Sequence, residues 1–339
     1  MSDKTIGAAI IGYGYMGRIR RRVIEADPAY RLVGVAEVPE RRPAGETSVR
    51  WFDRWQDLVA DKSVGAVFVC VPNNLIPDIT VACLEQGRHV FCEKPPGRTV
   101  DDIQAMRAAE AASGRKLMFG FNHRWHPAMQ EARRIIDSGA VGRVLWVKGT
   151  YGKSGGQGYE KSWRNDPAVS GGGILLDQGI HMVDLFRFYC GDFDRVKAFC
   201  GHSYWKVPVE DNAFVVFEND RGQHGILHSS ATLWKHVLKL EIGAEDGYLV
   251  IEGFLSASGS YGRETLTVGK RQFGGETRAQ GNPEEQRFAY DRDDSWALEV
   301  ANFARAITTG SKIEQCGSHD ALRAMELIFA AYRDSGLVD

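Results

Sequence analysis

The length, composition and charge of this chain are those of an ordinary folded protein with two domains. Its 339 residues exceed the usual size of one domain, and 43% hydrophobic with 25% charged residues exclude a disordered, fibrous or coiled-coil chain. The 42 basic and 44 acidic residues give a formal net charge of −2 without any long run of like charge, so nucleic acids and membranes are poor partners.

The cysteines and the absence of targeting patterns predict a cytoplasmic protein. Six cysteines, none of them in a C-x-x-C pair, lie mostly in apolar runs, as free thiols in a reducing compartment do. The first residues show no signal-peptide pattern, and no apolar window approaches the roughly 18 residues that cross a bilayer. We therefore expect no disulfide, no structural zinc and no membrane anchor.

Short apolar runs alternate with helical stretches in the first third of the chain, which is typical of a parallel sheet with helices on both faces. The runs 8–11 and 66–71 are continuously apolar, as strands covered on both sides are. Thr99 and Asp102 fit a capping pair for a helix that Gly114 ends. The expected strands and helices are, in chain order, 6–11, 16–26, 32–37, 66–71, 78–85, 89–92, 101–112 and 116–121.

A glycine-rich motif joins the first expected strand to the first expected helix and fits the dinucleotide-binding pattern G-x-G-x-x-G. Gly12 allows the tight turn, Gly14 lets the backbone approach a pyrophosphate, and Gly17 lets helix and strand pack closely. The helix N-terminus adds amide donors, and the intervening residues Tyr13, Tyr15 and Met16 become cofactor candidates. A glycine-rich turn without a ligand is the weaker alternative, because three such glycines are costly. The basic stretch from Arg18 to Arg22 in this helix is expected to be exposed.

Glu37 decides the expected type of dinucleotide. It ends the second apolar strand, 20 residues after Gly17, where a carboxylate accepts hydrogen bonds from the adenosine ribose hydroxyls and repels a 2′-phosphate. This favours NAD. NADP stays open as the alternative, because Arg41 and Arg42 follow within reach of a loop movement.

Lys94 follows the strand over 89–92, and the carboxyl ends of parallel strands are where doubly wound sheets bind ligands. A lysine at this place points toward the nicotinamide end of a dinucleotide. Glu93 before it and Pro95 and Pro96 after it indicate a rigid turn, in which a cis peptide bond is an option. A solvated strand-end lysine is the simpler interpretation of Lys94 taken alone.

After Asn122 the pattern changes, so we divide the chain into a dinucleotide-binding domain, 1–122, and a second domain, 123–339. The second domain opens with a helix at 127–137, a strand near 144–149, a polar glycine-rich stretch at 151–173 and a helix at 175–189. Alternating strands follow at 212–217, 225–231, 238–242, 248–251 and 265–268, which indicate an antiparallel sheet with one open face. A surface excursion is expected at 274–287, and the closing helices 296–308 and 320–332 could pack on either domain.

Asp177, His181 and Asp184 share one face of the helix over 175–189, since they stand four and three residues apart. Histidine suits proton transfer near neutral pH, and a neighbouring carboxylate can orient its ring. A zinc site is a competing idea, but the HExxH order is absent, and His123 with His126 is an equally unsupported pair. A structural Asp–His hydrogen bond is the other alternative.

Three motifs in this order resemble the glucose-fructose oxidoreductase, inositol dehydrogenase and MocA (Gfo/Idh/MocA) family over nearly the whole chain. They are 12–17, 93–95 and 172–184. The resemblance implies an α/β protein with an N-terminal Rossmann domain and a C-terminal α+β domain built on a large, mostly antiparallel sheet. It also implies a nicotinamide cofactor and a sugar, polyol or sugar-nucleotide substrate. The departures are Pro96, where leucine is more usual, and 71–74, which lacks a histidine often found a few residues later.

The resemblance gives the residues of the reacting centre, and the motifs described above give the other candidates. The reacting centre would be lined by Lys94, Asp177 and His181, and no metal is expected. The residues expected to bind the cofactor are Gly12, Tyr13, Gly14, Tyr15, Met16, Gly17, Glu37, Pro72, Asn73, Glu93 and Lys94. Those expected to bind the substrate are Lys94, Asn122, Tyr151, Lys153, Trp163, Arg164, Asp177 and His181, where the stretch 151–173 combines cations and aromatic faces suited to a sugar with an anionic group.

The function expected from these residues is that of an NAD(P)-dependent oxidoreductase that interconverts a ring hydroxyl and a ketone. His181 would move the hydroxyl proton, Lys94 would polarise the oxygen, and Asp177 would orient His181 or hold a neighbouring hydroxyl. The alternatives are an NAD-dependent glycosidase that oxidises its sugar transiently, and a non-catalytic dinucleotide-binding regulator. A homodimer or homotetramer formed through the C-terminal sheet is expected.

Overall fold

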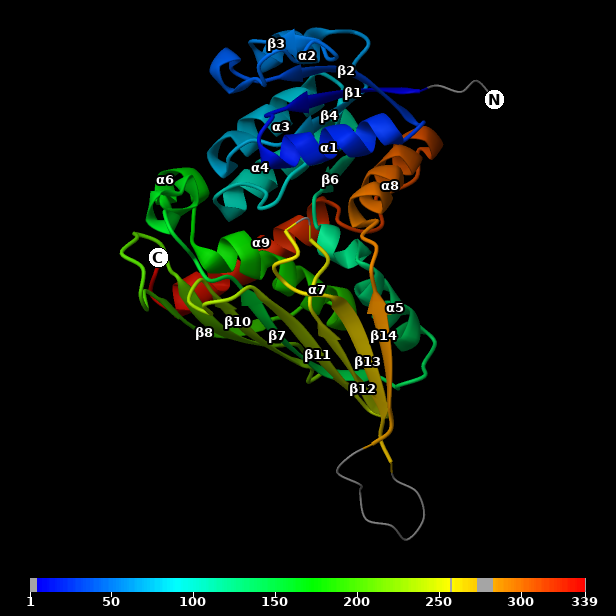
Figure 1. Ribbon diagram of the computed structural model, residues 1–339, viewed down its shortest axis with the longest axis vertical. Helices are drawn as coiled ribbons and strands as arrows, with labels where there is room; N and C mark the ends of the chain where they lie inside the picture. Colours follow the sequence, from blue (N-terminus) through cyan, green and yellow to red (C-terminus); the bar gives the residue numbers. More distant parts are fainter. Residues whose placement is uncertain (1–4, 257, 273–282, 339) are drawn as a thin grey trace. The chain divides into compact units, whose positions relative to one another are not determined.

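The computed structural model describes residues 5–256, 258–272 and 283–338, and the chain divides into two compact units (Figure 1). The first unit takes in Met1–Asn122, Ala168–Gly171 and Trp296–Met325, and the second takes in His123–Pro167, Gly172–Ser295 and Glu326–Asp339. The sequence did not decide where the first closing helix packs, and the structure groups it with the first unit. No helix among the described residues is long and apolar enough to cross a bilayer.

A six-stranded parallel sheet forms the centre of the first unit, in the order β3-β2-β1-β4-β5-β6. This is the doubly wound order of dinucleotide-binding domains, so the predicted Rossmann fold is confirmed. The continuously apolar strands β1 and β4 are buried along their whole lengths. The strands are β1 (Ile6–Ile11), β2 (Tyr30–Ala36), β3 (Trp51–Phe52), β4 (Ala66–Val69), β5 (His89–Cys92) and β6 (Leu117–Phe119).

Helices pack on the apolar strands of this sheet. Helix α1 contacts β1, β2 and β4. Helix α3 contacts β4 and β5, and α4 packs against α3. Thr99 and Asp102 form the predicted capping box of α4, and Gly114 ends that helix in a left-handed conformation. On α8, the Phe303 ring contacts Phe68 of β4 and Phe91 of β5. The helices are α1 (Tyr15–Ala26), α2 (Trp55–Ala60), α3 (Ile76–Glu85), α4 (Val100–Ser113), α8 (Ser295–Thr309) and α9 (Ser318–Asp334), the last of which runs into the second unit.

An eight-stranded sheet forms the second unit, in the order β14-β13-β12-β11-β7-β10-β9-β8. Among the strands that the structure describes in this sheet, only β7 and β10 pair in parallel, so the predicted mostly antiparallel sheet is confirmed. Burial alternates along β9 and β10, and helix α7 covers the buried face over β7 and β10. The strands are β7 (Val144–Gly152), β8 (Arg195–Gly201), β9 (Asn212–Glu218), β10 (His224–Ser230), β11 (Val237–Ala244), β12 (Gly247–Glu252), β13 (Glu264–Lys270) and β14 (Glu285–Tyr290).

The second unit corrects two sequence-based expectations, one for a helix and one for a strand. The helix expected over 175–189 begins as a π-helical segment, η6 (Leu175–Gly179), and continues as α7 (Ile180–Cys190). The strand expected over 144–149 runs on to Gly152, so Tyr151 lies in β7 and not in a loop. Helix α5 (Pro127–Asp137) has the predicted bounds, and α6 (Pro167–Ser170) is one turn long. Of the expected surface excursion, residues 274–282 lie outside the described residues.

Candidate functional site

The glycine-rich loop leaves its backbone open to a ligand at one point and is tightly packed elsewhere. A Cβ on Gly12 would lie 2.4 Å from the Cys70 carbonyl oxygen, and one on Gly17 would lie 2.1 Å from the Gly12 carbonyl oxygen. A Cβ on Gly14 would meet no atom within 4 Å. No side chain caps the N-terminus of α1, and its first turn contains no acidic residue. The loop and its helix therefore suit an anionic group such as a pyrophosphate.

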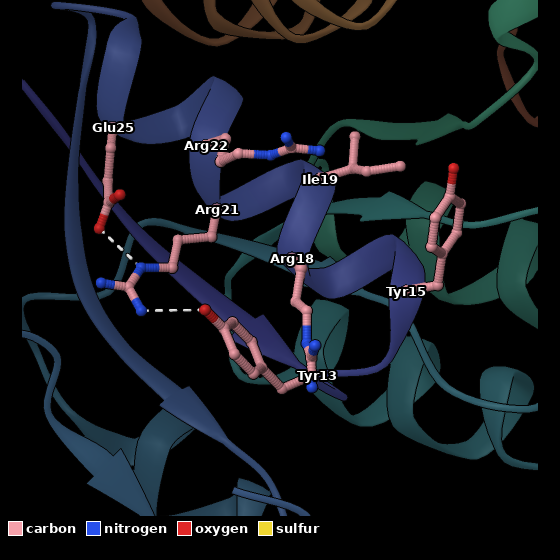
Figure 2. Close-up of a pocket in the computed structure, with 7 residues that line it drawn as sticks. All are labelled: Tyr13, Tyr15, Arg18, Ile19, Arg21, Arg22 and Glu25. Carbon is pink, nitrogen blue, oxygen red and sulfur yellow. Dashed lines mark hydrogen bonds and ion pairs between the residues drawn. The ribbon is translucent and has the colours of Figure 1, made fainter. Parts of the chain in front are cut away.

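Tyr13 and Tyr15 border a pocket on α1 beside this loop (Figure 2). The Tyr13 hydroxyl accepts a hydrogen bond of 2.9 Å from Arg21, and the Tyr13 ring packs edge-on against Trp51. The Tyr15 side chain points away from Tyr13 and is exposed. The Tyr13 side chain is therefore held in place beside the loop, whereas the exposed Tyr15 side chain has room to change its conformation.

Glu37 follows β2 and its carboxylate is aimed at the glycine-rich loop. One oxygen accepts a hydrogen bond of 2.7 Å from the Tyr13 amide, and the other accepts one of 2.9 Å from the Val38 amide. Arg42 donates to the Glu37 carbonyl oxygen, pairs with Asp53 and lies over the Trp51 ring. The Glu37 carboxylate thus faces the loop, and the Arg42 guanidinium lies beside the backbone of the same residue.

Glu93 and Lys94 follow β5 at the carboxyl edge of the parallel sheet, and the Lys94–Pro95 peptide bond is cis. The Glu93 carboxylate accepts a hydrogen bond of 2.7 Å from Arg20 on α1. Arg20 has no exposed surface and Arg21 only 9%, so the expectation that this basic stretch is exposed is wrong for both. Their carboxylate partners lie elsewhere in the first unit and draw both side chains inward.

Several other candidates of the first unit lie near this edge. Asn73, in η2 (Asn73–Leu75) after β4, is buried and donates 2.8 Å to the Ser170 carbonyl oxygen. Pro72 precedes η2, Met16 is half-buried in the first turn of α1, and Asn122 is buried at the start of η3 (Asn122–Trp125).

In the second unit, His181 lies on α7 within a cluster of buried rings. The imidazole of His123 stacks on that of His181 with ring centroids 3.7 Å apart, and both residues are buried. His123 Nε2 lies 3.1 Å from the Tyr151 hydroxyl. Burial raises the pKa of the Tyr151 phenol well above its ordinary range, so this hydroxyl keeps its proton and can donate it in a hydrogen bond. Of this group, His123 was considered from the sequence only as a possible metal ligand together with His126.

Asp177 lies in η6, where two cations reach its carboxylate. Lys153 Nζ is 3.2 Å from one oxygen and Arg164 Nε is 3.4 Å from the other. Lys153 follows β7, whereas Arg164 lies in η5 (Trp163–Asn165) and stacks on the half-exposed Trp163 ring. The glycine-rich stretch thus folds back onto the helix that carries Asp177 and His181, and both of its cations contact the Asp177 carboxylate.

Asp184 has a different environment from Asp177, although the sequence places both on one helix face. It accepts two hydrogen bonds, of 2.7 and 2.6 Å, from the buried guanidinium of Arg124. This pair anchors α7 to the segment before α5. Among the described residues no group of three or more His, Cys, Asp or Glu side chains could hold a metal ion, and all six cysteines are free thiols.

Glu210 is a supporting residue that sequence reasoning missed. Its buried carboxylate accepts hydrogen bonds from the Gly173 and Leu175 amides and from the Tyr332 hydroxyl, at 2.7, 3.0 and 2.7 Å. Burial raises the pKa of this carboxyl above its ordinary value. Glu210 therefore fixes the start of the helix that carries Asp177. The sequence around position 210 contains no local pattern that predicts this role.

Two models of one family match the chain. The model described as an oxidoreductase family with an NAD-binding Rossmann fold matches residues 6–121, and the GFO/IDH/MocA C-terminal domain matches residues 129–250. The first match confirms the predicted dinucleotide cofactor. The glycine-rich loop and Glu37 fit NAD, since the backbone at Gly14 leaves room for a pyrophosphate and the Glu37 carboxylate beside the loop suits ribose hydroxyls.

The relatives described next are two dehydrogenases and one oxidoreductase. A levoglucosan dehydrogenase from Pseudarthrobacter phenanthrenivorans is 29% identical over 66% of this chain and 60% of that protein. An inositol 2-dehydrogenase from Rhizobium meliloti is 25% identical over 97% of this chain and 96% of that protein. The crystal structure of an aldose-aldose oxidoreductase from Caulobacter crescentus, complexed with glycerol, superposes with a TM-score of 0.82 at 26% identity over 98% of both chains. The chain therefore belongs to the Gfo/Idh/MocA family of NAD(P)-dependent oxidoreductases.

Proposed function

We propose that this protein is an NAD-dependent dehydrogenase that interconverts a ring hydroxyl and a ketone on a sugar, polyol or sugar nucleotide. The single observation that carries the proposal is the placement of the histidine of α7 four residues after the carboxylate of η6, with two cations in contact with that carboxylate. When bound, the nicotinamide supplies the hydride acceptor or donor. The chain itself has to supply proton transfer and charge stabilisation.

We assign these tasks by chemistry. His181 removes or returns the hydroxyl proton, because imidazole exchanges protons near neutral pH. Lys94 polarises the reacting oxygen and stabilises its developing negative charge. Asp177 holds a neighbouring substrate hydroxyl or orients His181. The ring of His123 against His181 supports this assignment, since a stacked ring limits the rotation of the imidazole.

The local charge favours a substrate with an anionic group, such as a carboxylate or a diphosphate. Lys153 and Arg164 both contact Asp177, so two positive charges face one negative charge. Their side chains are 19% and 45% exposed, and Arg164 lies 4.5 Å from the centre of the Trp163 ring. A cation beside an aromatic face suits a sugar ring that carries an anion.

We also propose that the protein forms homo-oligomers through the open face of the eight-stranded sheet. Phe199 is 84% exposed and pairs in register with the exposed Phe214, and the exposed Val216 pairs with Ile226. An apolar strip of this kind on a sheet face suits a second copy of the chain. Phe199→Asp with Phe214→Asp should shift the mass measured by analytical ultracentrifugation to that of a smaller species.

The cysteine chemistry supports a reducing compartment, and we propose the cytoplasm. All six thiols are free. Burial raises the pKa of the Cys83 thiol to about 12, so that it stays protonated and inert. Fractionation of cells that express the tagged chain tests this assignment.

Replacement of the two proposed catalytic side chains tests the mechanism. With the substrate found by screening, Lys94→Met and His181→Ala should each lower kcat at least about 10²-fold with little change in NAD affinity. Lys116→Met is the control for the lysine, since Lys116 precedes β6 and so lies at the opposite edge of the parallel sheet. His228→Ala, on β10, is the control for the histidine. Near wild-type turnover in Lys94→Met or His181→Ala would remove that residue from the mechanism.

A further inference from the structure

Arg21, on α1, joins the glycine-rich loop to a segment that lies between β2 and β3. Only 9% of this residue is exposed. Its Nη1 donates 2.9 Å to the Tyr13 hydroxyl and 2.9 Å to Glu46 Oε2, and its Nη2 donates 2.6 Å to the Ser48 hydroxyl. Its Nε donates 2.8 Å to Glu25 on the same helix (Figure 2). One guanidinium therefore fastens the loop before α1 to a segment that follows 25 to 27 residues after it.

Trp51, the first residue of β3, closes these contacts into a ring. Its Nε1 donates 3.0 Å to the Glu46 carbonyl oxygen. Its indole lies edge-on to the Tyr13 ring, with centroids 5.1 Å apart. The Glu46 carboxylate also accepts a hydrogen bond of 2.9 Å from the Ser48 amide. The segment is thus held against Tyr13 twice, through the guanidinium of Arg21 and through the indole of Trp51.

Glu37, the carboxylate that fits the ribose hydroxyls, is bonded to both partners of this packing. Its side chain accepts a hydrogen bond of 2.7 Å from the Tyr13 amide. Its own amide donates 3.2 Å to the carbonyl oxygen of Phe52, the residue after Trp51. Arg21 therefore reaches Glu37 by two routes, one through the glycine-rich loop and one through β3.

We propose that Arg21 is a positioning residue of the cofactor site: by fastening Tyr13 to the segment 46–48, it holds the Glu37 carboxylate where the adenosine ribose of NAD binds, and so sustains a preference for NAD over NADP. The proposal rests on the NAD site of the proposed function and on none of its substrate chemistry. A guanidinium suits this task, because its planar fork bonds several acceptors in one fixed geometry.

Arg21→Met tests the proposal through cofactor affinity, which needs no substrate. We expect the Kd for NAD, measured by fluorescence titration, to rise roughly tenfold and that for NADP to rise less than about threefold. The reason is that NAD depends on the hydrogen bonds of Glu37 to both ribose hydroxyls, whereas the same carboxylate repels the 2′-phosphate of NADP. Equal rises for both cofactors would overturn the proposal.

A double-mutant cycle shows whether Arg21 acts through Glu37. In Glu37→Ala the ribose carboxylate is already absent. Adding Arg21→Met to that variant should therefore change the ratio of the two dissociation constants by less than about twofold. A change as large as that in the wild-type background would mean that Arg21 acts on the cofactor by another route, and it would overturn the proposal.

Arg22→Met is the matched control, because it removes the same charge from the next position of α1. Arg22 is exposed, and its side chain points away from Tyr13 (Figure 2). Both dissociation constants should stay within about twofold of the wild-type values, since an exposed charge contributes little. A rise in the Kd for NAD equal to that of Arg21→Met would show that charge near the loop matters rather than the bonds of Arg21, and it would overturn the proposal.

Glu46→Ala serves if Arg21→Met does not fold, because it removes one partner of the guanidinium and leaves α1 unchanged. Glu46 is flanked by exposed residues, so the parallel sheet and its helices keep their packing. We expect the Kd for NAD to rise about threefold or more, with a smaller rise for NADP. Unchanged affinity for NAD in this variant would overturn the proposal.

Amide hydrogen exchange gives a readout in the protein without cofactor. The amides of Tyr13 and of residues 46–51 should exchange faster in Arg21→Met than in Arg22→Met, because local opening becomes easier when the guanidinium is lost. Equal exchange would overturn the positioning role of Arg21. Wild-type turnover in His181→Ala would instead overturn the proposed mechanism and leave the binding and exchange results unaffected.

Discussion

The imidazole rings of His123 and His181 lie face to face, with centroids 3.7 Å apart and planes inclined by 19°. Tyr151 on β7 contacts the His123 ring from its edge, and Phe254 stacks against it at 4.3 Å. His181 is thus supported by a ring that is itself fixed on several sides.

We predict that His123→Ala lowers kcat roughly tenfold, because the support of the His181 ring is lost, whereas His123→Phe keeps a stacked ring and most of kcat. Steady-state kinetics at several pH values measure both effects. His228→Ala is the control, since His228 also stacks on an aromatic ring, that of Phe214, on the open sheet face. Wild-type kcat in His123→Ala would contradict the prediction.

Glu37→Ala should weaken the binding of NAD more than that of NADP. The variant loses the hydrogen bonds to the ribose hydroxyls of NAD, but for NADP it removes a repulsion of the 2′-phosphate. Fluorescence titration of both cofactors measures the two dissociation constants. Equal losses for both cofactors would exclude Glu37 from the ribose site.

Lys153→Ala and Arg164→Ala should each raise the KM for an anionic sugar and leave the affinity for NAD unchanged. Each variant removes one of the two cations that contact Asp177. Lys148→Ala, a lysine of β7 that pairs with Glu241, is the control. If neither variant changes the KM, a neutral sugar or polyol becomes the preferred substrate class.

We predict that His89 makes the folded state of the protein less stable as the pH falls into the mildly acidic range. Burial, with Arg115 and Lys116 nearby, lowers the pKa of this histidine from 6.5 to about 4. Between these values the unfolded chain binds a proton that the folded chain does not, so stability falls as the pH falls from about 6.5 to about 4. Its Nδ1 accepts a hydrogen bond from the Lys116 amide, which the Oδ1 of His89→Asn can replace.

Thermal unfolding across this pH range checks the contribution of His89. The melting temperature of His89→Asn should fall less steeply than that of the wild type. The exposed His202, changed to Asn, should keep the wild-type slope. An unchanged slope in His89→Asn would contradict the prediction.

The elements that the sequence predicted well are those whose burial follows a simple pattern. Strands β1 and β4 are continuously apolar, and the capping box at Thr99 marks the start of α4. Strand β14 was missed because its residues are nearly all exposed and leave no alternation, and β3 is only two residues long. Local patterns carry no signal for such elements, which form because a neighbouring strand offers hydrogen bonds.

The parts of the candidate site that depend on distant partners could not be predicted. Arg20 looks like one of several surface arginines until Glu93 and Glu299, 73 and 279 residues away, are seen to pair with it. The stacking of His123 on His181 likewise joins segments that no short motif connects. Motifs identify side chains, whereas tertiary packing decides which of them are buried and paired.

The central claim is that the protein oxidises a ring hydroxyl of a sugar-like substrate with NAD. The most direct measurement is a screen of free sugars, polyols and sugar nucleotides in which the absorbance of reduced nicotinamide is followed and the product is identified by mass spectrometry. We predict one reduced nicotinamide for each ketone formed, and loss of both signals in His181→Ala. Release of an aglycone without net formation of reduced nicotinamide, or bound NAD without turnover of any substrate, would contradict the claim and favour a glycosidase or a regulator.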